Sequence, residues 1–169
     1  IWKYILPHAQ SKFLRELSYF IDSRQIDIIT FSEIDGGSFR TRYINQLKTL
    51  ARATRLSHFK FFQTSTMLGS NQGNGILSRY PIRADFHERL SEKGEPRYLS
   101  GVRLDIHGTD LTFFTTHLSL RKSNRISQLE RMIGIINKTS GPIILTGDFN
   151  TEQQEELSLF HQTRLEHLQ

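Results

Sequence analysis

The chain has 169 residues, a length that predicts one domain able to bury a hydrophobic core. Hydrophobic residues make up 37% of it and charged residues 23%, which is typical of a globular protein and excludes extended disorder. The absence of cysteine excludes disulfide scaffolds, thiolate zinc sites and cysteine nucleophiles. Any metal would therefore be bound by carboxylate, amide oxygen or imidazole, and a carboxylate-rich site favours Mg²⁺, with Mn²⁺ or Ca²⁺ as alternatives.

The formal net charge of +5 is compatible with a polyanionic substrate such as nucleic acid. The Lys and Arg residues are scattered, however, and many small domains are mildly basic. No apolar run approaches the roughly 20 residues that span a bilayer, so we expect no membrane segment in this chain. We favour a cytoplasmic monomer. Because the sequence begins without Met, an upstream targeting segment or membrane anchor is left open.

In the first third of the chain, apolar residues recur at helical spacing on both sides of a β-branched run. Residues 11 to about 24 predict a helix that begins at Ser11, and residues 43 to about 55 predict a second helix. The run 26–31 between them predicts a buried strand that ends at Ser32 and Glu33. The side chains expected to face inward on the two helices are Phe13, Leu14, Leu17, Phe20, Ile21, Ile44, Leu47, Leu50 and Ala51.

The rest of the chain predicts a series of strands, followed by a helix, a strand and a polar helical stretch. The predicted strands are 58–67, 75–80, 98–106, 111–118 and 143–146, with a Gly/Asn-rich loop at 69–74 and a hairpin turn at 107–110. The predicted helices are 123–138, with Ile126, Leu129, Ile133 and Ile136 inward, and 152–160. This order predicts an α/β (α+β) four-layer sandwich, two packed mixed β-sheets flanked by helices.

Two of the predicted strands lead into acidic residues, Glu33 and Asp148. Ligands gather at the carboxyl ends of strands in open α/β sheets, so both carboxylates could reach one crevice. Asn150 lies two residues after Asp148 and on extended backbone would point the same way, while Gly147 would let a ligand approach the main chain. The alternative is structural: Asp, Gly and Asn after a strand usually form a turn, and Glu33 could cap the next segment.

A histidine, His117, ends the apolar strand predicted at 111–118. A histidine in such a place is more often a hydrogen-bonded core residue than a catalytic one. We therefore give it a catalytic role only if it lies in the same cleft as the two acids. Glu33, His117, Asp148 and Asn150 are predicted to converge there.

Five segments, in this order, resemble motifs of the endonuclease/exonuclease/phosphatase superfamily, which includes deoxyribonucleases, apurinic-site nucleases, sphingomyelinases and inositol phosphatases. They are DIITFSEID at 27–35, GNGILSRYPI at 73–82, TTHL at 115–118, Arg125 with Gln128 in a helix, and GDFN at 147–150. Each motif is modest, but five in order are specific, and they cover nearly the whole chain. The chain is identified as a member of this superfamily.

The resemblance implies a Mg²⁺-dependent phosphoester hydrolase that uses in-line attack of a metal-associated water on phosphorus. It assigns metal binding to Glu33, Asp148 and Asn150, and catalysis to His117, Asp148 and Asn150. His117 and Asn150 would also bind the phosphate. Arg97 would be a phosphate clamp, although an exposed arginine at a strand entrance is at least as good a reading.

The chain also departs from the family pattern. We expect residues 1–169 to form one domain that lacks the family's Asn-bearing first strand and its C-terminal Asp-His segment. Ser32 stands where many relatives have Gln. Three functions stay open: a phosphodiesterase or nuclease, a phosphoesterase acting on a small molecule or phospholipid, and a catalytically silent binding domain. No basic–aromatic insertion marks a DNA-gripping element.

Overall fold

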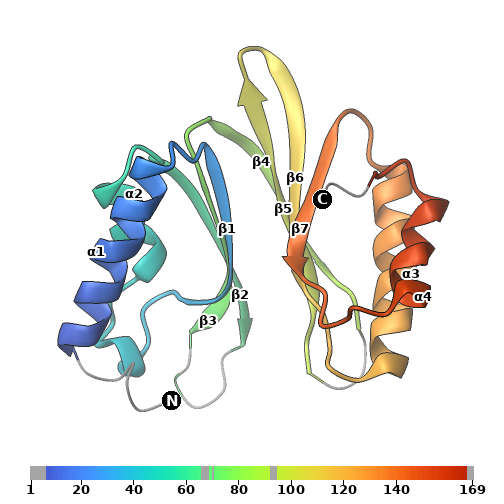
Figure 1. The fold of residues 1–169 in the computed structure, drawn as a ribbon, viewed down its shortest axis with the longest axis horizontal. Helices are drawn as coiled ribbons and strands as arrows, with labels where there is room; N and C mark the ends of the chain where they lie inside the picture. The colour runs from blue at the N-terminus through green and yellow to red at the C-terminus, as the bar shows by residue number, and fades with distance from the viewer. Residues whose placement is uncertain (1–6, 66–68, 70, 92–94, 167–169) are drawn as a thin grey trace. The chain divides into compact units, whose positions relative to one another are not determined.

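The strands of the protein form two sheets, one in each of two compact units (Figure 1). The structure is a computed structural model that describes residues 7–65, 69, 71–91 and 95–166, with the side chains of residues 7–11 left out. The units are Ile1–Arg83 and Ala84–Gln169, and each is described by itself. No helix in the described part of the chain has the length and apolar character needed to cross a bilayer.

The first unit contains a three-stranded antiparallel sheet in the order β1-β3-β2. Its elements are α1 (Pro7–Ser23), β1 (Ile28–Asp35), a 3₁₀ turn (Phe39–Thr41), α2 (Gln46–Ala53), β2 (His58–Ser65) and β3 (Gln72–Ser78). This sheet is antiparallel where a mixed sheet was expected. The predicted strand 58–67 is confirmed through Ser65, and its last two residues lie outside the described residues.

Helices α1 and α2 cover one face of this sheet (Figure 1). The buried side chains of this core are Leu14, Ile21, Ile34, Leu47, Leu50, Ala51, Leu56 and Leu77. Leu17 packs against them, whereas Phe13, Phe20 and Ile44 are exposed, so their predicted inward position is wrong. The helical spacing of apolar residues did not distinguish the buried centre of the apolar helix face from its exposed margins.

Both predicted helix starts in this unit are wrong. Ser11 lies inside α1, which begins at Pro7, a residue well suited to a first helical turn. Helix α2 begins at Gln46, and Asn45 is its N-cap because the Asn45 side chain accepts a hydrogen bond from the Lys48 N–H at 2.8 Å. Residues 36–45 therefore form a connection between β1 and α2, and Glu33 caps no helix.

A buried carboxylate, Asp35, organises this connection. Its Oδ1 accepts the N–H groups of Gly37 and Ser38, each at 2.8 Å, and its Oδ2 accepts the Ser38 hydroxyl at 2.6 Å. Thr41 and Arg40 each donate a further hydrogen bond to it, at 3.2 Å. Burial raises the pKa of Asp35, but the hydrogen bonds from Ser38, Gly37 and Thr41 outweigh it, so the pKa lies below its ordinary value.

The second unit is built on a four-stranded mixed sheet in the order β4-β5-β6-β7. Its elements are β4 (Ile82–Arg89), whose first two residues precede the boundary between the units, β5 (Tyr98–Ile106), β6 (Thr109–His117), α3 (Lys122–Lys138), β7 (Ile143–Asp148), α4 (Gln154–Leu157) and a 3₁₀ turn (Ser158–Gln162). β5 and β6 pair antiparallel, and β6 and β7 pair parallel. Strand β4, an edge strand rich in charged residues, is absent from the sequence-based prediction.

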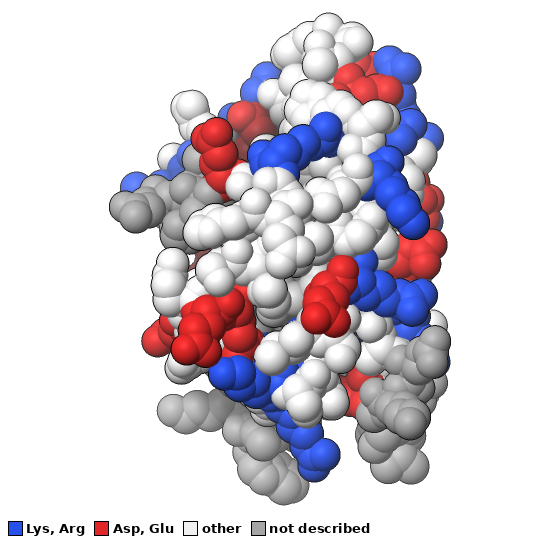
Figure 2. Space-filling view, turned by 90° about the vertical axis from the view of Figure 1, so that its right-hand side faces the viewer, with Lys and Arg blue, Asp and Glu red and all other residues white. Residues whose placement is uncertain are grey.

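The predicted hairpin is confirmed, with a tighter turn. His107 and Gly108 alone connect β5 to β6, and both have positive φ angles, 51° and 86°. Helix α3 packs Leu129, Met132 and Ile136 against Phe114 and the other apolar side chains of one sheet face. Acidic and basic side chains are interspersed over the face that contains α3 and α4, without one continuous basic patch (Figure 2).

We predict that Asp35→Asn destabilises the protein by about 2–4 kcal/mol at neutral pH, because it leaves buried donors unsatisfied. The pKa of Asp35 is lower in the folded than in the unfolded state. Its contribution is therefore complete above the unfolded pKa and disappears as the pH falls through the folded pKa. Urea denaturation at pH 7 and at about pH 3 should show wild type and variant converging in acid.

The matched control is Asp110→Asn, which changes an exposed carboxylate and should alter the free energy of unfolding by less than about 0.5 kcal/mol. A difference between wild type and Asp35→Asn that is unchanged in acid would contradict the role given to this carboxylate.

Candidate functional site

The strongest site candidates lie where β6 and β7 end. The two strands run parallel with Thr116 opposite Gly147 and His117 opposite Asp148, so both carboxyl ends reach the same edge of the sheet. A ligand at this edge would meet side chains from both strands. The sequence-based expectation that His117 and Asp148 lie together is met within this unit.

Gly147 is required for this pairing. Its φ angle is 141°, and a Cβ atom added there would lie 2.1 Å from the Thr116 carbonyl oxygen, closer than any real contact. The glycine lets the two backbones approach just before the strand ends. It thereby brings Asp148 beside His117.

Asp148 and Asn150 form a hydrogen-bonded turn, as the structural alternative predicted. Asp148 Oδ1 accepts the Asn150 N–H at 2.9 Å, and Asn150 has a φ angle of 51°. The Asn150 side-chain amide donates to the Leu118 carbonyl at 2.7 Å, and the Leu118 N–H donates to the Asp148 carbonyl at 2.9 Å. The turn does not exclude chemistry, because the Asp148 side chain is 54% exposed.

His117 lies beside the second carboxylate oxygen of Asp148. Its Nε2 is 3.7 Å from Asp148 Oδ2, which is too long for a direct hydrogen bond but within range of an ion pair if the imidazole is protonated. The His117 side chain is 13% exposed. The His117 ring is therefore mostly buried, and its Nε2 lies next to the exposed Asp148 carboxylate.

An open pocket of about 670 Å³ adjoins this turn. It is lined by the backbone and side chains of residues 147–153 together with Arg125. A volume of this size accommodates a small substrate or one unit of a polymer.

A buried ion pair joins α3 to α4, and its arginine, Arg125, lines the pocket. Arg125 Nε donates to Glu156 Oε2 at 2.8 Å, and Arg125 Nη2 donates to Glu156 Oε1 at 2.9 Å. The hydrogen bonds between them raise the pKa of Arg125. They also lower the pKa of Glu156, outweighing the effect of its burial. Both groups are therefore charged over the whole physiological range.

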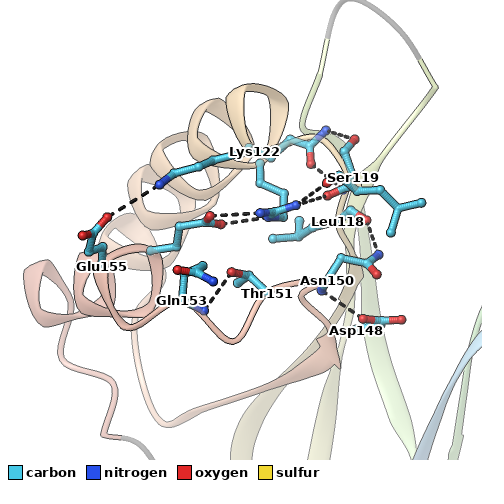
Figure 3. Close-up of polar contacts among 12 residues, drawn as sticks. Leu118, Ser119, Lys122, Asp148, Asn150, Thr151, Gln153 and Glu155 are labelled. Atoms are coloured by element: carbon cyan, nitrogen blue, oxygen red, sulfur yellow. Dashed lines mark hydrogen bonds and ion pairs between the residues drawn. The ribbon is translucent and has the colours of Figure 1, made fainter.

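The same arginine also fixes the loop that follows β6. Arg125 Nη1 donates to the carbonyl oxygens of Ser119 at 3.2 Å and Leu120 at 2.5 Å. Gln128, fully buried, accepts the Ser119 N–H at 3.0 Å and donates to the Ser119 hydroxyl at 2.9 Å. This loop carries the Leu118 carbonyl that holds Asn150, so the ion pair reaches the turn through the loop (Figure 3).

The sequence had indicated Arg125 and Gln128 as a motif without giving either a function. Glu156 was missed altogether. Its only signal was its place in a polar stretch predicted to be helical, and such residues are usually solvated. Its partner Arg125 is distant along the chain, so local patterns could not reveal the pair.

Arg97 directly precedes β5, at the sheet edge where β6 ends, because Leu99 pairs with Thr116. Its side chain is only 11% exposed, so the alternative of an exposed arginine is wrong. Its Nη2 donates to Glu95 at 2.7 Å. Its Nε is buried and has no hydrogen-bond partner among the described residues, which leaves a donor at this edge.

Glu33 belongs to the first unit. It lies at a bulge in β1, between Phe31 and Ile34, with a φ angle of 60°, and it is exposed. A non-glycine residue at positive φ in a strand is uncommon, and such strain is frequent at functional sites. The approach of Glu33 to Asp148 remains a prediction.

A metal at the β6–β7 edge would meet oxygen donors. The described residues contain no group of three or more His, Cys, Asp or Glu side chains able to hold a metal. Mg²⁺ keeps several of its waters and needs one or two carboxylates together with substrate phosphates. The exposed Asp148 carboxylate with the Asn150 amide fits that requirement, and it does not fit an imidazole-centred zinc site.

Solved structures of other proteins have folds similar to that of this chain. One is a mannosyl-6-phosphatase of Bacteroides thetaiotaomicron, with a TM-score of 0.66 and 21% identity over 89% of this chain and 61% of that chain. Another is an endonuclease/exonuclease/phosphatase family protein of Leptotrichia buccalis, with a TM-score of 0.69 and 20% identity over 90% of this chain and 65% of that chain. These likenesses confirm the expected α/β sandwich fold.

Sequence comparison gives the family. The uncharacterised protein YbhP of Escherichia coli is 29% identical over 107 residues, which are 60% of this chain and 42% of YbhP. The chain thus spans about two fifths of that relative. A family model matches residues 8–168, which include every motif described above. The chain belongs to the Endonuclease/Exonuclease/phosphatase family.

Proposed function

We propose that the full-length protein is a Mg²⁺-dependent phosphoester hydrolase in which water attacks phosphorus in line with the leaving oxygen. The observation that carries the proposal is the Asp148–Asn150 turn, placed beside His117 at an open pocket. Its family consists in general of hydrolases of phosphoester bonds, which supports the same conclusion. The structural likeness to a mannosyl-6-phosphatase is a likeness of fold.

In this proposal Glu33, Asp148 and Asn150 hold the metal, which supplies neutralising charge to the phosphoryl oxygens. Asp148 accepts a hydrogen bond from the attacking water and orients it, since its side chain is 54% exposed. His117, next to it, donates to a non-bridging oxygen. With one Nδ2 hydrogen committed to Leu118, Asn150 has its Oδ1 and its other amide hydrogen for the ligand.

Arg97 is proposed to bind the phosphate from the other side of β6. Its buried Nε is an unsatisfied donor, and burial of such a donor is unfavourable unless a ligand accepts from it. An arginine fork matches the geometry of phosphate oxygens. Glu95, which already pairs with Nη2, holds the guanidinium in place.

We predict that Asp148→Asn lowers kcat by at least about 10²-fold, because it removes the carboxylate that orients the water. Asn at this position keeps an oxygen that can accept the Asn150 N–H, so the turn should persist. The assay uses full-length protein with saturating Mg²⁺ and both p-nitrophenyl phosphate and bis-p-nitrophenyl phosphate, which separates monoester from diester activity.

The control is Glu155→Gln, an exposed carboxylate on the neighbouring helix α4 that should leave kcat unchanged. Equal turnover by wild type and Asp148→Asn would show that the water is oriented elsewhere. If wild type turns over no phosphoester, including plasmid DNA, oligonucleotides, sphingomyelin and inositol phosphates, the protein is instead a catalytically silent binding domain.

We further predict that the Arg125–Glu156 pair positions the turn as well as stabilising the fold. Glu156→Gln leaves a buried guanidinium without its carboxylate and should destabilise the protein by about 3–5 kcal/mol. The double variant Arg125→Met/Glu156→Leu removes both charges and should recover most of that stability. It still lacks the donor to Ser119 and Leu120, so kcat should stay at least about 10-fold low.

Thermal unfolding, steady-state kinetics and the NMR signal of the Asn150 side-chain amide test whether the effect of the pair on stability can be separated from its effect on kcat. The expected result is a stable double variant with a shifted or broadened Asn150 amide and an altered kcat. A double variant with wild-type kcat and an unchanged amide signal would mean that the pair only stabilises the fold.

A further inference from the structure

The connection from β1 to α2 presents two aromatic rings to solvent. Phe39 is 79% exposed and Tyr43 is 75% exposed, and Arg40 and Arg42 lie between them in the chain. We refer to residues 39–43 as the aromatic–arginine segment. A segment of five residues is too short for its composition to stand out in the sequence.

The backbone of this segment is fixed although its rings are exposed. Asp35 accepts hydrogen bonds from both sides of the 3₁₀ turn, and the N–H groups of Arg42 and Tyr43 donate to the carbonyls of Phe39 and Ser38 at 3.0 and 2.7 Å. Gly36 and Asn45 close the connection with a β-bridge.

Two consecutive residues of this fixed segment are strained. Arg42 and Tyr43 have φ angles of 52° and 63°, a left-handed conformation that costs each non-glycine residue about 1 kcal/mol or more. Such strain persists only where the surrounding structure imposes it. The hydrogen bonds around Asp35 and those to the Phe39 and Ser38 carbonyls impose it here, so the backbone that carries both rings loses little conformational freedom on binding.

Exposed rings next to guanidinium groups match one ligand chemistry in particular. A nucleobase stacks on an aromatic face, and its phosphate is attracted by a nearby arginine. Arg40 is held by Asp35 and is 48% exposed on its side chain, so its position is set before a ligand arrives. Base faces are available for stacking in single strands but not inside a duplex.

The segment is also close in the chain to the proposed metal ligand. Glu33 lies two residues before Asp35, at the same end of β1, and both belong to the first unit. The segment therefore belongs to the connection that leaves the carboxyl end of β1, the end that carries Glu33. This step rests on the proposed function.

We propose that the aromatic–arginine segment binds an unstacked base of single-stranded nucleic acid, which makes single-stranded nucleic acid the substrate class of the site. A lipid surface is the less favoured occupant, because arginines interrupt the apolar residues and Arg40 is tied to a buried carboxylate.

The binding test uses fluorescence anisotropy with a labelled twelve-residue oligothymidylate and full-length protein in EDTA, so that no hydrolysis occurs. Phe39→Ala and Tyr43→Ala should each weaken binding by about 5- to 100-fold, the range expected for one stacked base. Tyr43→Phe should bind like wild type because it keeps the ring, and Phe39→Leu should not. The matched control is Tyr19→Ala, which removes a ring 76% exposed on α1 and should have no effect.

Salt dependence separates stacking from charge. Arg42→Gln should reduce the slope of log affinity against log salt concentration by about 0.7, the value for one phosphate contact on a single strand. Phe39→Ala should leave the slope unchanged while lowering affinity. Arg15→Gln, an exposed arginine of α1, is the control for charge.

The proposal would be overturned by equal losses in Tyr19→Ala and Phe39→Ala, or by a Phe39-dependent binding to phosphatidylserine vesicles with no binding to the oligonucleotide. Failure of the proposed function is distinguishable. Hydrolysis of p-nitrophenyl esters without oligonucleotide binding defeats this inference alone. Ring-dependent oligonucleotide binding without hydrolysis of any phosphoester supports the segment and defeats the proposed function.

Discussion

The close parallel pairing of β6 with β7 is the constraint on which the rest of the site depends. The register places His117 opposite Asp148, and it is sterically possible because Gly147 has no side chain to meet the Thr116 carbonyl. Everything downstream follows from this approach: the Leu118 N–H reaches the Asp148 carbonyl, and the Asn150 amide reaches the Leu118 carbonyl. A wider spacing would separate the histidine from the acid.

The buried polar side chains of α3 and α4 hold the loop that follows β6. Arg125 divides its donors between Glu156 and the carbonyls of Ser119 and Leu120, and Gln128 binds the N–H and the hydroxyl of the same Ser119. A buried ion pair is seldom the most stable filling for its volume, since well-packed apolar side chains often do as well. Its directional donors explain its presence here, because apolar side chains could not bind the Ser119 and Leu120 carbonyls of the loop whose Leu118 carbonyl holds Asn150.

Local patterns predicted the β6–β7 edge well, because a β-branched run that ends in Gly-Asp-Phe-Asn carries its strand, its turn and its acid within a few residues. They missed β4, whose alternation is masked by charged residues on an edge strand. They began α2 too early, since residues 36–45 are folded by side-chain hydrogen bonds to Asp35 and end in the Asn45 cap, and helical periodicity shows neither. Glu156 was missed for the same reason: its partner is brought to it by folding.

The left-handed backbone at Asn150 has a consequence for how this position can vary. Asparagine, aspartate and glycine tolerate a φ angle of 51°, whereas most other side chains lose about 1 kcal/mol or more there. The backbone conformation therefore limits which residues position 150 can accept, independently of any requirement of the reaction. Anyone engineering the site would separate the two effects with glycine, which preserves the backbone and deletes the amide, and not with alanine, which changes both.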